Sequence, residues 1–305
     1  MHLGLIGLGK MGGNMRARVR AAGHEVVGYD RNLEVSDADD LAAMVQALPA
    51  PRVVWVMVPS GEPTRATIAD LEPLLDSGDL VIDGGNSRWT DDTVNATLLD
   101  QRGIGYLDCG VSGGVWGKEY GYGLMVGGSP ANVELAMPIF DALRPEGPRD
   151  EGFVHAGEVG AGHYTKMVHN GIEYGLMQAY AEGYELLAAK DLVTDVHGAF
   201  KAWTRGTVVR SWLLDLLVKA LEEDPELERI SGFTEDSGEG RWTVEEGIAN
   251  AVPMPVISSA LFARFASRQD DSPAMKAVSA LRGQFGGHPT KAAQAGPSSG
   301  TGSTS

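Results

Sequence analysis

The chain opens with a pattern that few folds accommodate: an apolar segment, a glycine-rich turn, a helical segment, and a second apolar segment that ends in an acid. The apolar segments at 2–6 and 24–29 lie on either side of the turn Gly7–Gly12, which has the form G-x-G-x-x-G. Such a turn lets a pyrophosphate approach a helix N-terminus, where free N–H groups bind anions. Asp30 follows at the position where an acid accepts a hydrogen bond from the ribose 2′-OH. The pattern predicts a doubly wound, Rossmann-type α/β domain that binds a dinucleotide.

The cofactor predicted from this pattern is NAD or NADP. Asp30 would repel a 2′-phosphate, whereas Arg31 beside it favours one. The segment after Asn32 is too short to hold the further helix and strand of a full mononucleotide half, so the wall beside the adenosine is reduced. A deazaflavin coenzyme of the F-420 type is therefore an alternative hydride acceptor. The predicted cofactor-binding residues are Gly7, Leu8, Gly9, Lys10, Met11, Gly12, Asp30, Arg31, Val58, Pro59 and Asn86.

Strand and helix patterns alternate up to about residue 160, and helical patterns alone follow. We expect a cofactor-binding domain at 1–160, a helical substrate and dimerisation domain at 161–291, and a disordered tail at 292–305 that is too polar to form a core. The glycine-rich segment 110–117 is expected to be an anion-binding loop after a short strand. The predicted helices include 37–48, 163–190, 195–202, 210–223, 244–250, 255–267 and 273–284.

The charge balance excludes some partners. The 305 residues carry a net charge of -16, which repels nucleic acid and anionic membranes, so an anionic substrate needs a locally basic pocket. No apolar run approaches the ~20 residues that cross a bilayer, and the chain starts directly with a strand. Cys109 is the only cysteine, which excludes an intrachain disulfide and a cysteine-based metal site. We expect a cytoplasmic protein.

The segment Gly160–Gly175 carries most of the candidate chemistry. Lys166, Asn170 and Glu173 follow one another at helical spacing, so they share one face of a predicted helix. A lysine and a glutamate on one face can serve as an acid–base pair if burial lowers the pKa of the lysine. For an arbitrary helix, a solvated polar stripe is the more common explanation. We predict no metal site, since His155, His163 and His169 have no carboxylate at ligand spacing beside them in the sequence.

Three segments resemble the decarboxylating 6-phosphogluconate dehydrogenases in their short bacterial form, within the β-hydroxyacid dehydrogenase superfamily. They are Gly84–Ser87, Val111–Gly117 and Gly160–Tyr174, and the resemblance extends to about Pro289. It implies conversion of 6-phosphogluconate to ribulose 5-phosphate and CO2, with hydride transfer to a cofactor. The chain departs from the long family forms at Glu235–Thr243, where their additional lysine is missing, and it also lacks their large C-terminal half.

The resemblance also implies the roles of individual residues. Lys166 would take the proton of the C3 hydroxyl, and Glu173 would later protonate C1. Arg282 and His288 would bind phosphate in the neighbouring subunit, which makes the active unit at least a homodimer. The implied substrate-binding residues are Asn86, Ser112, Gly113, Gly114, His169, Asn170, Tyr174, Arg264, Arg282 and His288.

Two other functions fit part of the sequence. A β-hydroxyacid dehydrogenase that oxidises a small hydroxy acid without decarboxylation would share Lys166 and the glycine turn, but it would not need the phosphate-binding residues. A catalytically silent sugar-acid binding protein would not need both Lys166 and Glu173. Release of CO2 separates the first alternative from the decarboxylating enzyme, and a Lys166→Ala variant with unchanged behaviour would support the second.

Overall fold

The computed structural model describes residues 1–286 together with Pro289 and Lys291. The chain forms two compact units. The first comprises Met1–Val196 and Ser237–Ser258, and the second comprises His197–Asp236 and the described residues from Ser259 onward. The first unit therefore contains both the glycine turn and the segment around Lys166, which are the parts that carry the candidate chemistry.

A seven-stranded sheet forms the centre of the first unit, in the order β2-β1-β3-β4-β5-β6-β7. Neighbouring strands are parallel except for β5 and β6, which pair antiparallel. Strand order reverses at β1, so the glycine turn that follows β1 lies at the switch point where doubly wound sheets bind ligands. The strands are β1 His2–Ile6, β2 Glu25–Tyr29, β3 Val53–Val56, β4 Leu80–Asp83, β5 Gly105–Ser112, β6 Gly123–Gly128 and β7 Phe153–Gly157.

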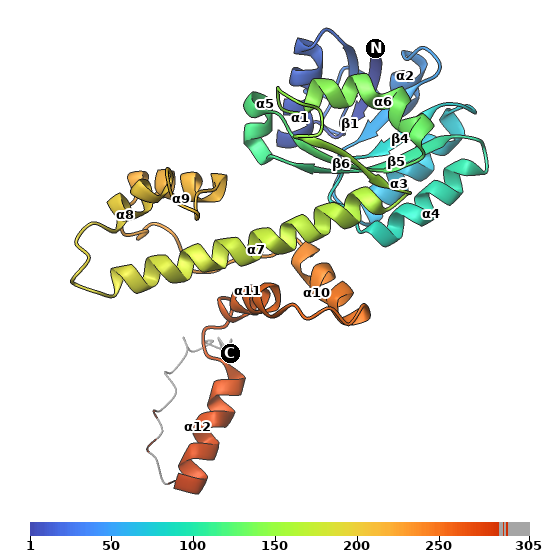
Figure 1. Ribbon diagram of the computed structural model, residues 1–305. Coiled ribbons are helices and arrows are strands. Elements are labelled where there is room, and N and C mark those ends of the chain that lie inside the picture. The colour runs from blue at the N-terminus through green and yellow to red at the C-terminus, as the bar shows by residue number, and fades with distance from the viewer. Residues whose placement is uncertain (287–288, 290, 292–305) are drawn as a thin grey trace, which may run out of the picture. The chain divides into compact units, whose positions relative to one another are not determined.

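Helices cover both faces of the sheet (Figure 1), and each face has its own apolar cluster. One cluster joins the sheet to α1 and α6, and within it the Trp55 and Phe140 rings meet edge to face at 5.9 Å. The other joins the sheet to α2, α3 and α4. All four residues of β3 are buried, as expected of a parallel strand covered on both sides. These helices are α1 Lys10–Ala21, α2 Leu41–Gln46, α3 Glu62–Leu71, α4 Trp89–Asp100 and α6 Pro130–Leu143.

The connection between β2 and β3 is short, and β2 is an edge strand of the sheet. The helix in this connection is shorter than the predicted 37–48, because Asp37 closes a turn instead. Its carboxylate accepts hydrogen bonds from Gly28 N at 2.8 Å and from Arg20 at 2.6 Å. The helix begins only after Asp40, which caps it by accepting from Ala43 N.

The segment 110–117, predicted to be a loop, begins as strand. β5 continues to Ser112 because its last residues pair with β6, with Ser112 opposite Gly123. A 3-10 turn at Gly114–Trp116 and the short helix α5, Gly117–Tyr120, follow. The prediction placed the end of the strand too early because glycines are typical of loops, whereas here the hydrogen-bonded pairing with β6 continues through them.

The helix predicted at 163–190 is α7, Ala161–Ala188, and it extends from the sheet as one continuous helix (Figure 1). It packs against α10, Glu239–Ala249, which starts earlier than the predicted 244. The hydroxyl of Thr243 joins the two helices, since it lies 2.8 Å from the carbonyl oxygens of both Met167 and Glu239. Ile172, on another face of α7, is 52% exposed in this chain.

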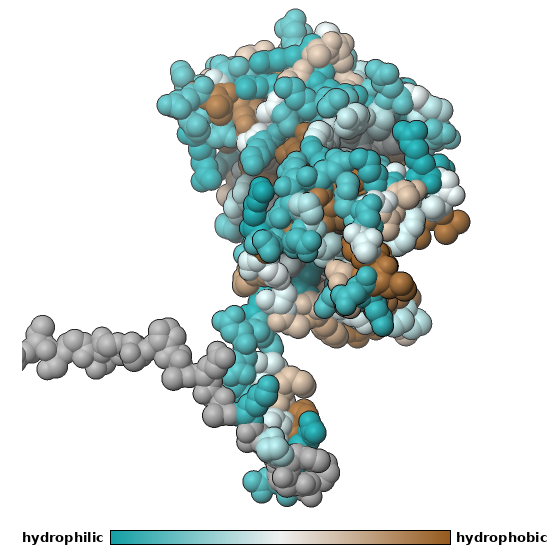
Figure 2. Space-filling model, turned by 90° about the vertical axis from the view of Figure 1, so that its left-hand side faces the viewer, coloured by the Kyte–Doolittle hydropathy of each residue, from teal (hydrophilic) through white to brown (hydrophobic). Residues whose placement is uncertain are grey.

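The second unit is helical. Its ion pairs include Lys201 with Glu222 at 2.7 Å and Arg268 with Asp236 at 2.7 Å. Among the described residues, no helix combines the length and the apolar character needed to cross a bilayer. On the face that Figure 2 shows, hydrophilic residues cover most of the surface and apolar residues form separate patches. The remaining helices are α8 Val196–Trp203, α9 Trp212–Glu223, α11 Pro255–Ala266 and α12 Pro273–Gly286.

Candidate active site

The glycine turn brings β1 directly against the N-terminus of α1. Gly7 has φ of +89°, and a Cβ on it would lie 2.3 Å from the Met57 carbonyl oxygen. A side chain is therefore excluded there by both conformation and space. The α1 N-cap is Gly9, which makes no side-chain capping bond. The first amides of α1 thus have no side-chain cap, and such amides hold an anion such as a pyrophosphate.

Asp30, at the end of β2, is tied to the glycine turn. Its Oδ2 accepts from Leu8 N at 2.6 Å, and its Oδ1 accepts from Asn32 N at 2.9 Å. Two backbone donors keep the carboxylate in place at the rim of the turn. A fixed carboxylate here accepts hydrogen bonds from ribose hydroxyls and repels a phosphate ester.

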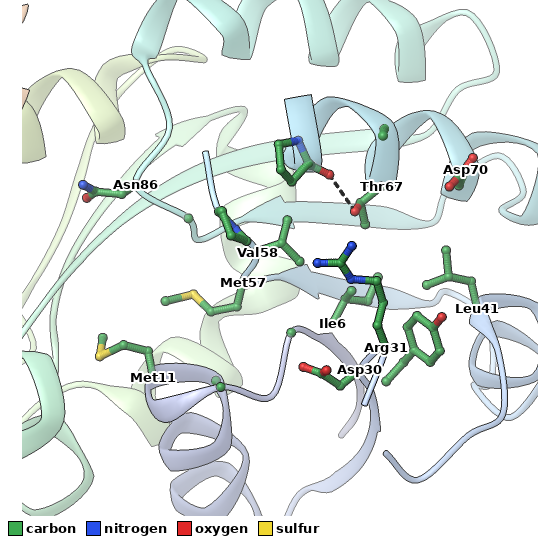
Figure 3. A pocket seen from close by; sticks show the side chains of 18 of the residues that line it. Ile6, Met11, Asp30, Arg31, Leu41, Met57, Val58, Thr67, Asp70 and Asn86 are labelled. Carbon is green, nitrogen blue, oxygen red and sulfur yellow. Dashed lines mark hydrogen bonds between the residues drawn. The ribbon is translucent and has the colours of Figure 1, made fainter. Parts of the chain in front are cut away.

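A cavity of about 700 Å³ extends along the carboxyl ends of β1, β3 and β4. Every predicted cofactor residue except Leu8 lines it, and the Leu8 amide is bonded by Asp30 instead. Figure 3 shows Asn86 at one end of the cavity and Leu41 with Asp70 at the other, with Arg31 between Asp30 and α3. A cavity of this size with an uncapped helix N-terminus fits a nicotinamide dinucleotide.

The end of the cavity away from Asn86 is walled by helices and not by a further strand. Leu41 from α2 and Ala66, Thr67 and Asp70 from α3 line it. Although the connection after Asn32 is short, the cavity therefore has a wall on the adenosine side. The residues that form it were not among the predicted cofactor-binding residues.

The N-terminus of α7 is fixed by a buried acid on β5. Asp108 Oδ1 accepts from Gly160 N at 2.7 Å, and Oδ2 accepts from His163 N at 2.8 Å. A carboxylate at a helix N-terminus is favoured by the helix dipole as well as by these bonds. These bonds hold the start of α7, the helix that carries Lys166, against the middle of the sheet.

His163, one turn before Lys166, lies in a buried acidic cluster. Its Nδ1 is 2.9 Å from both carboxylate oxygens of Asp92. Burial lowers the pKa of His163, but Asp92, Asp83 and Asp108 outweigh that effect and raise it to about 10. The Asp83 carboxylate accepts from Gly85 N and from Ser87. Asp83, Asp92 and His163 are close enough for a metal, but these hydrogen bonds already give the group a structural role.

Lys166 is buried, with 7% of its surface exposed, and its Nζ donates to Asn170 Oδ1 at 2.6 Å. Burial lowers the pKa of this amine, and Glu239 and Glu173 oppose that change. Gly110 on β5 makes the close approach of α7 possible, because a Cβ there would lie 2.3 Å from Lys166 Cβ. The lysine is thus a buried amine that can lose its proton, as the acid–base interpretation requires.

Neighbouring predicted residues gather around this amine. Asn170 Oδ1 also lies 2.9 Å from His169 Nδ1, and His169 Nε2 lies 3.5 Å from the Ser112 hydroxyl. Gly113 has φ of +131° and Gly114 has φ of +53°, which turn the chain after β5. These side chains form a row of donors and acceptors suited to the hydroxyl and carboxylate groups of a sugar acid.

Tyr174 belongs to the same helix but is bonded across to the segment before α10. Its hydroxyl accepts from Ser237 N at 3.1 Å and lies 3.4 Å from the Ser237 hydroxyl. Only 5% of the tyrosine is exposed. Its predicted contact with a phosphate remains a prediction.

The predicted site residues did not include Glu239, which is the first residue of α10 and is 2% exposed. Its carboxyl group faces Lys166 and Asn86. The residues Gly238-Glu239-Gly240 were a weak signal, since glycines on both sides of an acid allow close approach to it. The contact itself joins positions far apart in the chain.

The predicted phosphate-binding residues outside this cluster lie elsewhere. Arg264 is in the second unit, where its Nη1 donates to the Glu235 carbonyl at 3.0 Å. Arg282 is an exposed residue of α12. His288 and the tail 292–305 lie outside the described residues. The roles of Arg264, Arg282 and His288 remain predictions.

Comparison with known proteins gives consistent results. Residues 2–145 match the family model described as the NAD binding domain of 6-phosphogluconate dehydrogenase, and residues 162–295 match the C-terminal domain of that enzyme. The NAD(+)-dependent decarboxylating 6-phosphogluconate dehydrogenase of Haloferax volcanii is 43% identical over 94% of this chain and 98% of its own length. A putative 6-phosphogluconate dehydrogenase of Bacillus subtilis is 40% identical over 95% of this chain and 99% of its own. The solved 6-phosphogluconate dehydrogenase of Plasmodium falciparum has a TM-score of 0.80 at 26% identity, and the match covers 94% of this chain and 65% of that one.

Proposed function

The chain belongs to the 6-phosphogluconate dehydrogenase family, and we propose that it catalyses the oxidative decarboxylation of 6-phosphogluconate to ribulose 5-phosphate and CO2. The observation that carries the proposal is the buried amine of Lys166, held by Asn170 and lowered in pKa by burial. It faces Glu239, whose carboxyl group meets Asn86 at the end of the cofactor cavity. A base beside a dinucleotide cavity is what oxidation of an alcohol requires.

Lys166 acts in its neutral form and takes the proton of the C3 hydroxyl. The residues that line the cavity would hold a nicotinamide dinucleotide, which would supply the hydride acceptor for C3. The Lys166 ammonium then donates a hydrogen bond to the C3 ketone oxygen, which stabilises the negative charge that develops there as CO2 leaves. Glu173 protonates C1 of the resulting enediol. Asn86, Ser112 and His169 bind the carboxylate and hydroxyls, and His169 and Ser112 already lie within 3.5 Å of each other.

We propose NAD as the preferred cofactor. Asp30 is the support for this choice, because two backbone donors hold its carboxylate where a 2′-phosphate would lie. Arg31 favours NADP, but Asp70 lines the same cavity as a second acid in addition to Asp30. A deazaflavin remains the third cofactor to be tested, although residues of α2 and α3 line the cavity at the end away from Asn86.

We further propose a functional boundary near residue 160: the domain before it binds the cofactor, and the domain after it binds the substrate. The active form would be at least a homodimer, with Arg282 and His288 acting in the neighbouring subunit's site and with Tyr174 and Arg264 on the phosphate. The proposal places the enzyme in the cytoplasm, where membranes retain the phosphorylated substrate and the dinucleotide.

The test is to incubate the purified protein with 6-phosphogluconate and, separately, NAD, NADP or a deazaflavin, while reduced cofactor and CO2 are both measured. We expect equal amounts of reduced NAD and CO2, and loss of both in Lys166→Met. Cofactor reduction without CO2 would instead indicate a non-decarboxylating hydroxyacid dehydrogenase. Binding of 6-phosphogluconate without turnover, unchanged in Lys166→Met, would indicate a sugar-acid binding protein.

A further inference from the structure

Glu239 is a carboxyl group in a place that disfavours charge. It is 2% exposed, and its Oε2 has no hydrogen-bond partner among the described residues. A buried acid without compensation is strongly disfavoured, so acids are rarely buried without a partner or a purpose. No role assigned above explains why an acid is present at this position.

The groups that face Glu239 come from two elements. From α7, Lys166 is the opposite charge that lowers the pKa of Glu239 most, and His163 has a smaller effect in the same direction. Glu173 is a like charge that raises this pKa. From the loop after β4, the Asn86 side chain hydrogen-bonds to the carboxyl group. Glu239 acts on Lys166 in turn, and it raises the pKa of the Lys166 amine more than Glu173 does. Glu239 therefore joins the base of the reaction to the residue at the end of the cofactor cavity.

We propose that Glu239 is a positioning residue that orients Lys166 and Asn86 and accepts the proton that Lys166 must lose before it can act as a base. This inference rests on the proposed function. In the transfer, one N–H bond of the Lys166 ammonium breaks and an O–H bond forms on the Glu239 carboxyl group. The pair is neutral in total before and after, so no proton has to leave the buried site.

The surroundings favour this transfer. In water an ammonium does not protonate a carboxylate, since the two pKa values lie ~6 units apart. Burial penalises the charged form of each group, so it lowers the pKa of Lys166 and raises the pKa of Glu239. The Oε2 atom, which has no partner within the described part of the chain, can carry the proton without breaking a hydrogen bond found there. Glu173, by contrast, is only partly buried.

The decisive measurement is the acid limb of kcat/KM against pH for the wild type and Glu239→Gln. In the wild type the proton moves within the pair, so activity persists down to the lower apparent pKa of the pair. In Glu239→Gln the lysine must release its proton to solvent, and we expect the limb to move to higher pH by about one unit. A limb that moves to lower pH would show that Glu239 is only a fixed counter-charge, and an unmoved limb would show that it has no part. Either result overturns the proposal.

Two further variants complete the design. Glu245→Gln changes an acid on the same helix whose side chain is 55% exposed, and its limb should match that of the wild type. Glu239→Asp keeps a carboxyl group and should retain the wild-type limb with a lower kcat. If Glu239→Gln does not fold, infrared difference spectra of the wild type on binding 6-phosphogluconate without cofactor should show a protonated carboxyl band that weakens or shifts in Glu239→Asp. Absence of this band overturns the proposal. A wild type that does not turn over 6-phosphogluconate would instead refute the proposed function.

Discussion

Gly110→Ala should damage both stability and catalysis, because Gly110 determines how closely α7 approaches the sheet. A Cβ at this position would lie 2.3 Å from Lys166 Cβ and 3.0 Å from the Gly162 carbonyl oxygen. Two carbons need about 3.5 Å, so α7 must move by about 1 Å. The obstacle is the base of the lysine side chain, which cannot turn aside as a flexible end could.

The steric part of this change can be isolated with Gly123→Ala on the neighbouring strand. There the new Cβ would meet Ser112 Cβ at 3.9 Å, which is ordinary contact. Both substitutions gain about 0.4–1 kcal/mol from the lower entropy of the unfolded chain. Overpacking costs about 1–3 kcal/mol and applies to Gly110→Ala alone, so the two variants should differ by that amount in free energy of unfolding.

Urea unfolding followed by tryptophan fluorescence measures the stability difference, and steady-state reduction of NAD with 6-phosphogluconate measures catalysis. A shift of about 1 Å in the base should lower kcat by about 100-fold in Gly110→Ala. Gly123→Ala should retain activity. The reasoning is refuted if the two variants are equally stable and equally active, since the lysine would then tolerate the added methyl group.

Three other outcomes test separate parts of the structure. Asp30→Asn should raise the KM for NAD about tenfold, since a neutral amide accepts weaker hydrogen bonds, and it should improve the relative use of NADP; an unchanged NAD/NADP ratio would contradict the role of Asp30. Thr243→Val removes the hydroxyl that joins α10 to α7 and should cost about 1 kcal/mol of unfolding free energy, whereas Thr243→Ser should cost less. The pKa of His163 is raised from 6.5 to about 10, so the stabilisation it provides is complete below pH 6.5 and is lost as pH rises towards 10. The melting temperature of the wild type should therefore fall as pH rises over that interval, and a His163→Gln variant with the same pH dependence would refute the assignment.

The parts of the fold that could be predicted are those encoded locally. The glycine turn and Asp30 were visible because backbone sterics and anion binding impose a short, fixed spacing. The long helix α7 was visible from its period, which also placed Lys166, Asn170 and Glu173 on one face.

The errors came from contacts between distant segments. The helix expected from residue 37 begins at Leu41 because Asp37 bonds back to β2 and α1. Strand β5 runs on to Ser112 because β6 pairs with it. Glu239 escaped notice because its burial depends on the packing of α10 against α7, which local periodicity does not encode.

The two glutamates near Lys166 show why a single acid would not suffice. In the proposed reaction, Lys166 has to be neutral at the start and cationic after it has taken the C3 proton, while a different group must hold a proton ready for C1. Glu239 is enclosed and exchanges protons most easily with the lysine itself, whereas Glu173 is partly exposed and can be recharged from solvent. Substitution of Glu173 should therefore block the last step after CO2 has left, and substitution of Glu239 should impair the first. The order in which CO2 release and ketose formation fail in the two variants would distinguish their roles even if both lose overall turnover.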